Sequence, residues 1–291
     1  MAAEQVGAVA DGGPPDDATR RSLERARFEL VPMRGVDGQL EHLPPGAVVT
    51  VTASPTRGLD ATVELVTEVV ARGHRAVPHL SARLVRSEAH LDRLLDRLHE
   101  LALREVFVIA GDTPSPAGPF EGAADLLEAI AARGRPFEHV GISGYPETHA
   151  FLTDRVVVDA MQRKLPHATY IVSQICYDPV VVRGWLSTLR ARGVVLPVYV
   201  GLPGVIDRAK LLRVSLRVGL GDSVRFLRKQ SDVATHVLTG YTPDELVWGL
   251  ADLLHDPHAG VAGWHLFTFN EVERTERWRQ ELLAGKGGPQ T

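Results

Sequence analysis

Short apolar runs rich in valine and isoleucine recur along this chain, and a helical pattern follows each of them. Such runs are typical of parallel strands, which are buried on both faces and therefore do not alternate between apolar and polar residues. Eight strands are expected, near residues 27–31, 47–52, 75–79, 105–110, 138–142, 169–173, 197–200 and 263–267. Eight strand–helix repeats with short links predict an α/β fold, a single (β/α)8 TIM barrel.

The segments between these runs carry helical periodicity. For example, leucines recur at the spacing of one helix face at Leu91, Leu94, Leu95, Leu98 and Leu101. Helices are expected near residues 59–72, 86–102, 121–133, 149–164, 178–192, 206–217, 241–255 and 270–284, with an extra helical piece at 223–231. Several of them end in the sequence Ala-Arg-Gly, where the glycine suits the left-handed residue that follows a helix.

The domain organisation follows from length and composition. No low-complexity linker interrupts the chain between residues 23 and 284, so 291 residues predict one barrel rather than two smaller domains. Residues 1–22, rich in Ala, Gly, Pro and Asp, are interpreted as a disordered N-terminal tail, 23–285 as the catalytic barrel and 286–291 as a C-terminal tail. There is no signal-peptide pattern and no apolar run of the roughly 20 residues that span a bilayer, so a cytoplasmic protein is expected.

Charge and cysteine content exclude several classes of function. A net charge of −4 offers no electrostatic basis for binding nucleic acid or an anionic membrane. The single cysteine, Cys176, excludes an internal disulfide and a multi-thiolate metal site. His79 and His149 have no third ligand at a suitable spacing, so no metal is expected. Phosphate-binding glycine motifs and a nucleophile elbow are absent.

Polar side chains stand at the ends of several apolar runs, where a (β/α)8 barrel assembles its active site. Glu29 lies between Phe28 and Leu30 in the first of these runs. Burial should raise the pKa of its carboxyl group, which suits a general acid near neutral pH. The alternative is a structural glutamate that is ion-paired with a nearby arginine.

Asp112 and Gln174 are the other two candidates. Asp112 follows Gly111 at the end of the fourth run, and its carboxylate suits the amidine-like edge of a pterin or guanine. The alternative is an Asx-turn or a helix N-cap. Gln174 ends the sixth run and offers a donor and an acceptor to a heterocycle, or else bonds to loop backbone.

The motifs that contain these residues resemble, in their order, those of the methylenetetrahydrofolate reductase family. The matching segments are Phe28-Glu29-Leu30-Val31-Pro32, Pro78-His79-Leu80, Gly111-Asp112-Thr113-Pro114, Gly144-Tyr145-Pro146-Glu147-Thr148-His149, Arg163-Lys164, Ser173-Gln174-Ile175-Cys176-Tyr177-Asp178, Gly201-Leu202-Pro203-Gly204 and His265-Leu266-Phe267-Thr268-Phe269-Asn270. The resemblance implies a (β/α)8 barrel that reduces 5,10-methylenetetrahydrofolate, a small-molecule partner, to 5-methyltetrahydrofolate.

The resemblance also implies roles for individual residues. Glu29 matches the family's proton donor, and Asp112 and Gln174 match positions that hold the pterin edge and take part in catalysis. Substrate-binding residues implied in addition are Tyr145 and Phe267. The cofactor cleft retains Thr52, His79, Tyr145, His149 and Lys164.

Some positions depart from the family's pattern for gripping FAD. Ala110 stands where an arginine is typical, and Val157 and Ala160 stand near positions that in the family normally offer an acid and an amide. Val214 replaces an aromatic residue that in the family usually contacts substrates. Each charge-assisted hydrogen bond lost costs about 1.5–3 kcal/mol of binding. We therefore expect a flavin-lacking branch of the family, in which NADH occupies the vacated cleft and gives its hydride directly to the folate.

Four alternatives remain. The first is the same reaction through bound FAD, and the second is a pterin-binding methyltransferase-type barrel. The third is a non-catalytic folate-binding or partner-binding barrel. The fourth, a phosphate-binding aldolase or isomerase, ranks last because the Schiff-base lysine expected at a strand end is absent. NADH against NADPH preference and a homo-oligomeric state are left open.

Overall fold

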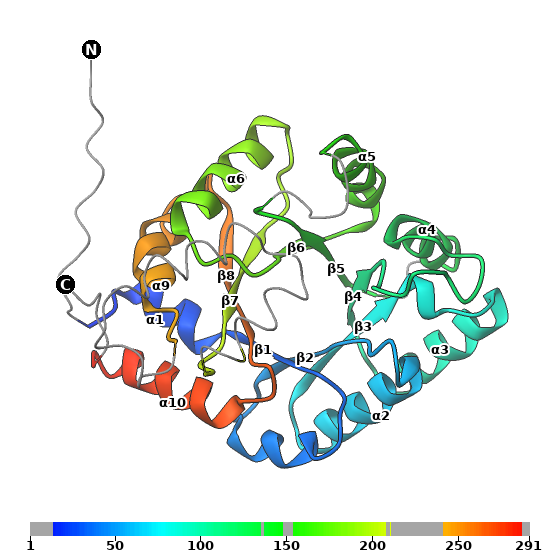
Figure 1. The fold of residues 1–291 in the computed structure, drawn as a ribbon, viewed down its shortest axis with the longest axis horizontal. Coiled ribbons are helices and arrows are strands. Elements are labelled where there is room, and N and C mark those ends of the chain that lie inside the picture. Colours follow the sequence, from blue (N-terminus) through cyan, green and yellow to red (C-terminus); the bar gives the residue numbers. More distant parts are fainter. Residues whose placement is uncertain (1–13, 135–136, 148–153, 208–209, 211–240, 287–291) are drawn as a thin grey trace.

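The computed structural model describes residues 14–134, 137–147, 154–207, 210 and 241–286. Within them, parallel strands β1 to β8 close into a barrel in chain order, with β8 pairing back to β1 (Figure 1). The strands are β1 Arg27–Leu30, β2 Val48–Val51, β3 Arg75–Ser81, β4 Glu105–Ile109, β5 His139–Gly144, β6 Tyr170–Ser173, β7 Val198–Pro203 and β8 Val261–Phe267. The predicted (β/α)8 barrel is confirmed, and every strand overlaps its expected range.

Helices surround the barrel, as the hydrophobic spacing predicts (Figure 1). The described α-helices are α1 Asp17–Glu24, α2 Gly58–Ala71, α3 Glu88–Glu100, α4 Ala123–Ala132, α5 Asp154–Lys164, α6 Pro179–Ala191, α9 Asp244–Leu250 and α10 Val272–Leu283. Short 3-10 helices are η1 Val36–His42, η2 Ala82–Leu84, η3 Leu165–His167 and η5 Ala251–Leu254. Most of the helix expected at 206–217, and all of the extra piece at 223–231, lie outside the described residues.

Helix α1 differs from the disordered tail expected over residues 1–22. Asp16 caps this helix by accepting a hydrogen bond from the Thr19 amide at 2.8 Å, and Leu23 near its end is fully buried. The helix packs against β8, η5 and α10. The ordered domain therefore begins before residue 23, because tertiary contacts stabilise a polar segment whose composition alone is typical of a tail.

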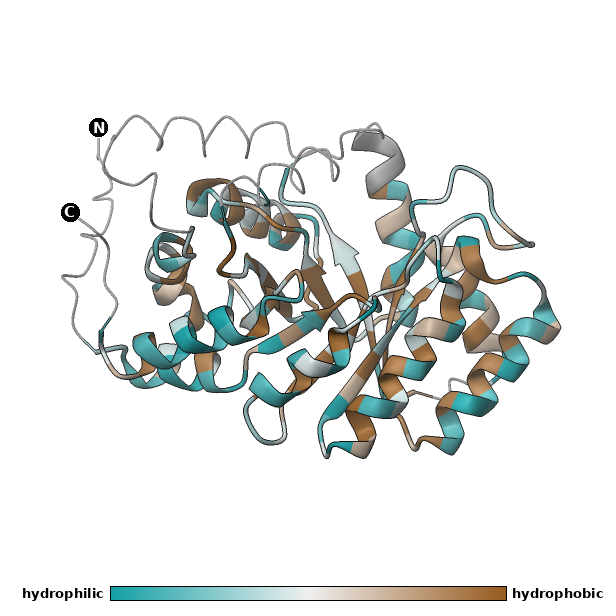
Figure 2. Ribbon diagram, turned by 60° about the horizontal axis from the view of Figure 1, so that its bottom comes forward, coloured by the Kyte–Doolittle hydropathy of each residue, from teal (hydrophilic) through white to brown (hydrophobic). Residues whose placement is uncertain are grey.

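Successive strand residues face two different apolar environments. Outward residues such as Val49, Val106 and Ile142 belong to the core between the strands and the helices. Figure 2 shows the matching helix surfaces, with brown apolar residues along one side and teal polar residues along the other. Inward residues such as Phe107 and Val172 form a separate cluster inside the barrel. The barrel interior is therefore a packed layer rather than a channel.

The amino-terminal end of the barrel interior contains a buried ion pair. Arg27 at the start of β1 bonds to Glu105 at the start of β4. The guanidinium carbon of Arg27 lies 4.6 Å from the centre of the Tyr170 ring and 4.3 Å from that of Tyr199. Because the cation is both paired and enclosed by rings, this end of the barrel is suited to stability rather than chemistry.

Candidate active site

Glu29 meets two histidines toward the carboxyl end of the barrel. Its Oε2 lies 3.1 Å from Nε2 of His265 on β8 and 3.8 Å from Nε2 of His79 on β3. The Glu29 side chain is only 13% exposed, and both histidines are buried. Strands β3 and β8, which are distant in the sequence, therefore each place an imidazole ring beside the carboxyl group on β1.

The electrostatics of this group favour a protonated carboxyl. Burial raises the pKa of Glu29 to about 7, although the charge on His79, when protonated, opposes the rise. Burial lowers the pKa of His79 to about 4 and that of His265 to about 3, and Arg27 adds to the second shift. Both imidazoles are consequently neutral near pH 7, so neither supplies the positive charge that would keep Glu29 ionised. The expected rise in the Glu29 pKa is thus present, and the nearby Arg27 pairs with Glu105 instead.

The loop after β8 holds the backbone beside Glu29. The Thr268 hydroxyl donates to the Glu29 carbonyl at 2.5 Å. The Asn270 amide accepts from the Val31 N–H at 2.8 Å and donates to the Val31 carbonyl at 2.9 Å. Phe269 and Asn270 have φ values of 51° and 61°, which side-chain-bearing residues rarely adopt. The contacts of Thr268 and Asn270 offset the cost of this conformation and lock the end of β1 to the end of β8.

Asp112 lies beyond the end of β4, on an exposed loop. Gly111 before it has a φ of 94°, and a Cβ there would lie 2.0 Å from the Ser81 hydroxyl oxygen, so only glycine fits. Arg83 supports the loop by donating to the carbonyls of Thr113 at 2.9 Å and Glu121 at 2.9 Å. The structure shows no hydrogen bond from Asp112 to another described residue, and the N-cap of α4 is Gly122. The carboxylate is therefore open to a ligand, although it is more exposed than a place inside the barrel mouth would imply.

Tyr145 and Lys164 come together at the end of β5. The Tyr145 hydroxyl lies 3.1 Å from the Ser143 hydroxyl, and the Lys164 ammonium donates to the Ser143 carbonyl at 3.1 Å. Burial raises the pKa of Tyr145, and the negative charge of Asp112 adds to the rise. Burial lowers the pKa of Lys164 to about 8. Because β4 and β5 are paired neighbours in the barrel, Asp112 and Tyr145 follow adjacent strand ends.

Gln174, Thr52 and Phe267 complete the described candidates. The Gln174 side-chain oxygen accepts a hydrogen bond from the Ile175 N–H at 2.9 Å. Of the two roles expected for Gln174, this is the one in which the side chain bonds to loop backbone. Thr52 is half-buried just beyond β2, and its amide donates to the Leu30 carbonyl at 2.9 Å. Phe267 is half-buried and lies over Gly201, where a Cβ would approach the ring to 2.5 Å. All three lie at strand ends on the same side of the barrel as Glu29.

The positions that depart from the family's pattern, and His149, lie only partly within the described residues. His149 and Val214 lie outside the described residues, as does the side chain of Val157. Ala110 is exposed, and Ala160 on α5 is half-buried. Sequence reasoning gave no role to His265, Thr268 or Asn270. The signal for His265 was present, because it interrupts the apolar run of β8 as Glu29 interrupts that of β1.

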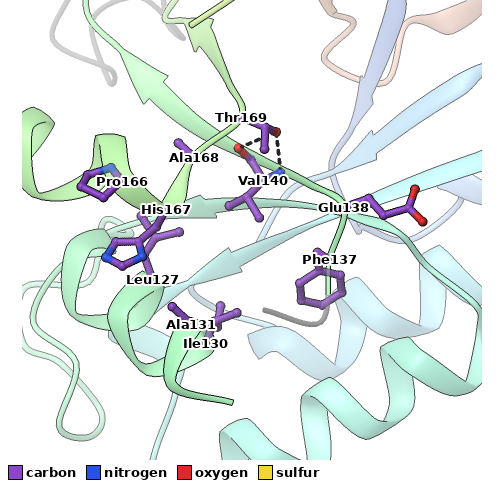
Figure 3. A pocket seen from close by; sticks show the side chains of 10 residues that line it. All are labelled: Leu127, Ile130, Ala131, Phe137, Glu138, Val140, Pro166, His167, Ala168 and Thr169. Atoms are coloured by element: carbon purple, nitrogen blue, oxygen red, sulfur yellow. Dashed lines mark hydrogen bonds between the residues drawn. The ribbon is translucent and has the colours of Figure 1, made fainter. Parts of the chain in front are cut away.

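The cavity drawn in Figure 3 lies away from this site. It has a volume of about 180 Å³ and lies between the end of α4, the start of β5 and the η3 segment. Its walls include Val140 and Thr169, joined by hydrogen bonds at the amino ends of β5 and β6. It therefore lies near the end of the barrel opposite Glu29.

Neither a metal centre nor a membrane-spanning helix is present in the described part of the chain. Among the described residues, no three histidine, cysteine, aspartate or glutamate side chains are grouped so that they could hold a metal ion. None of the helices in the described ranges is long and apolar enough to cross a membrane. The cytoplasmic location and the homo-oligomeric state stay predictions.

Comparisons with known proteins agree with the motifs. Residues 38–226 match the model of the methylenetetrahydrofolate reductase family. Methylenetetrahydrofolate reductase 2 of Saccharomyces cerevisiae is 26% identical over 134 residues, which cover 42% of this chain and 22% of the yeast protein. Methylenetetrahydrofolate reductase 1 of Schizosaccharomyces pombe is 28% identical over 133 residues, which cover 43% of this chain and 22% of the Schizosaccharomyces pombe protein. The match thus spans about a fifth of the length of these relatives.

Among solved structures, a chitinase from Rhizomucor miehei superposes with a TM-score of 0.44 and 11% identity. The superposition covers 89% of this chain and 99% of the chitinase chain, and a likeness of this size carries no conclusion about function.

Proposed function

Because the chain belongs to the methylenetetrahydrofolate reductase family, we propose that it reduces 5,10-methylenetetrahydrofolate to 5-methyltetrahydrofolate with hydride from NADH, directly and without a flavin. The observation that carries this proposal is the largely buried Glu29 carboxyl at the carboxyl end of the barrel, whose ion-pair partners among the described residues are two imidazoles that are neutral near pH 7. A site of this kind delivers a proton at neutral pH.

Proton delivery is what the first chemical step requires. The bond between the bridging methylene carbon and N10 of the folate breaks, N10 takes a proton, and a 5-iminium cation remains. Glu29 supplies that proton and becomes a carboxylate, which is reprotonated from solvent. Hydride from NADH then adds to the methylene carbon, giving the methyl group and NAD⁺.

Asp112 and Gln174 are assigned to the pterin ring. The exposed Asp112 carboxylate suits the 2-amino group and N3–H of the pterin, and its negative charge stabilises the iminium cation. The side-chain oxygen of Gln174 already accepts a hydrogen bond from Ile175, so the side-chain amide nitrogen is the group assigned to donate to the pterin. Tyr145 and Phe267 provide ring surfaces at neighbouring strand ends.

The described residues do not fit a resident flavin dinucleotide. Ala110 and Ala160 offer no charge, and the Arg163 guanidinium bonds to Asp125 and Glu128 of α4 on the outside of the barrel. Lys164 is the one cation that these positions bring to the cleft wall, and it already donates to Ser143. Nanomolar retention of a cofactor needs about 12 kcal/mol of binding free energy, whereas a substrate used at about 0.1 mM needs roughly half of that. These positions are therefore better suited to NADH, which binds transiently as a co-substrate, and His79 and Thr52 are assigned to its binding.

The test is an absorption spectrum of the purified full chain, followed by an NADH-oxidation assay with methylenetetrahydrofolate. We expect a colourless protein, consumption of NADH and sequential kinetics. Stoichiometric bound flavin with ping-pong kinetics would contradict the flavin-free mechanism and favour the FAD alternative. Methyl transfer without NADH consumption would favour the methyltransferase type, and folate binding without any turnover would favour a non-catalytic barrel.

A further inference from the structure

The β8 histidine, His265, has no role in the proposal so far, although it makes the closest contact with the Glu29 carboxyl among the described residues. Its Nε2 lies 3.1 Å from Glu29 Oε2, within hydrogen-bond range. The Nε2 of His79 approaches the same oxygen only to 3.8 Å and has no hydrogen-bond partner among the described atoms. Of the two imidazoles, only His265 is therefore bonded to the carboxyl group.

The surroundings of His265 hold its ring in one place. The residue is 1% exposed, and the Phe267 ring lies 4.8 Å away at an angle of 64°. Two residues of the adjoining loop, Thr268 and Asn270, bond to the backbone of Glu29 and Val31. The β8 segment therefore fixes the main chain of the acid and its side chain together.

The unpaired nitrogen of His265 indicates which tautomer is present. Nδ1 is buried and has no hydrogen-bond partner among the described residues. A neutral imidazole carries one N–H, and a buried N–H without an acceptor is rarer than an acceptor without a donor. The arrangement with the lower cost places the hydrogen on Nε2, so that His265 donates to Glu29 Oε2. The acidic proton of Glu29 then resides on Oε1, the oxygen that His265 does not engage.

We propose that His265 is a positioning residue that donates from Nε2 to Glu29 Oε2, and so directs the transferable proton to Oε1 and stabilises the carboxylate left after transfer. This inference rests on the proposed function of Glu29 as the proton donor. Among the described residues, the titratable groups that face Glu29 from packed elements are His79 on β3 and His265 on β8, while Arg27 lies two residues earlier on β1. Because both imidazoles are neutral near pH 7, the expected effect of His265 is that of a hydrogen-bond donor and not of a cation.

The first test compares His265→Gln with His265→Leu. The Gln side chain keeps an N–H donor near the position of Nε2 without titrating, whereas Leu removes the donor. In single-turnover hydride transfer we expect His265→Leu to be about 10–100-fold slower and His265→Gln to recover most of the rate, with the folate KM little changed in either. The pH above which activity falls should rise in the Leu variant, because Glu29 loses a donor to its ionised form. Equal rates and equal pH profiles for the two variants would overturn the proposal.

A second measurement needs no variant and no activity. The ¹⁵N chemical shifts of the His265 imidazole in the parent protein are expected to show the Nε2–H tautomer, and an Nδ1–H tautomer would overturn the proposal even if the Leu variant failed to fold. The two proposals can fail separately. A parent that does not oxidise NADH with methylenetetrahydrofolate contradicts the function, whereas an active parent with the Nδ1–H tautomer contradicts only the role of His265.

Discussion

Two carboxyl groups lie inside the same barrel, Glu105 near its amino end and Glu29 toward its carboxyl end, and they differ in the charge of their neighbours. Glu105 bonds to the guanidinium of Arg27, which is enclosed by Tyr170 and Tyr199. In the part of the chain that the structure describes, the ion-pair partners of Glu29 are two neutral imidazoles, although it stands two residues after Arg27 on the same strand. A buried carboxylate with a cation serves the fold, whereas one without a cation keeps a proton that chemistry can use. The identity of the partner, rather than the residue type or the depth of burial, distinguishes the two.

The comparison is tested most directly by removing the acidic proton. Glu29→Gln keeps the size of the side chain and its hydrogen bonding but cannot donate a proton, so we expect hydride transfer to methylenetetrahydrofolate to slow by about 10²–10⁴-fold. The thermal unfolding midpoint should change little at about pH 4.5, because the parent carboxyl, with a pKa of about 7, is protonated in the folded state there. Single-turnover NADH oxidation measures the first effect and calorimetry the second. A fully active Gln variant would mean that the proton comes from another group.

The opposite pattern is expected at the amino end. Arg27→Met removes the buried cation of Glu105 and leaves it with the largely exposed Arg75, whose guanidinium lies 3.9 Å from Glu105 Oε2. We expect the free energy of unfolding to fall by about 3–5 kcal/mol in urea titrations. The matched control is the double variant Arg27→Met with Glu105→Gln, in which no unpaired charge remains and part of the loss is recovered. If Arg27→Met were as stable as the parent, the ion pair would not be the structural element described here.

The pH dependence of stability separates the two carboxyls again. The Glu29 pKa is about 7 in the folded state against about 4.5 for an unperturbed glutamate, so the fold binds this proton more tightly than the unfolded chain does. Its contribution to stability is complete below about pH 4.5 and is lost as the pH rises through 7. The pKa values of His79 and His265 are lowered, so these two histidines make the fold less stable as the pH falls below 6.5. The Gln variant contains the same histidines, so a comparison with the parent largely removes their contribution.

The difference in unfolding free energy between the parent and Glu29→Gln should therefore fall by on the order of 2 kcal/mol from pH 5 to pH 8. Denaturant unfolding of both proteins across this range gives the measurement. A difference that is constant with pH would show that Glu29 is already ionised in the fold.

The smallest effect concerns the loop that carries Asp112. Gly111→Ala places a Cβ 2.0 Å from the Ser81 hydroxyl oxygen at a φ of 94°, so we expect a loss of about 1–3 kcal/mol in stability and a raised KM for the folate. Gly134→Ala is the matched control, because its φ is 86° but no atom lies within 4 Å of the added Cβ. It should lose about 1 kcal/mol and keep its KM. Equal KM values for the two variants would show that Asp112 does not take part in substrate binding.

Much of the fold could be read from the sequence. Burial on both faces requires continuous apolar runs, and these mark all of the strands within a few residues. The tail boundary was wrong because α1 is stabilised by contacts with β8 and α10, which composition does not reveal. The raised pKa of Glu29 was also predictable, since a carboxylate inside such a run is desolvated wherever the strand packs.

The partners of these residues could not be predicted in the same way. His265 lies 236 residues from Glu29 in the sequence and reaches it only because β8 closes the barrel against β1. The same closure decides that Arg27 meets Glu105 rather than Glu29, and loop geometry decides that Gln174 bonds to Ile175. Periodicity, a local property of the chain, determined where the strands and the buried acid lie. Only the tertiary structure decided which charges meet, because the pairing of distant strands depends on the packing of the whole barrel.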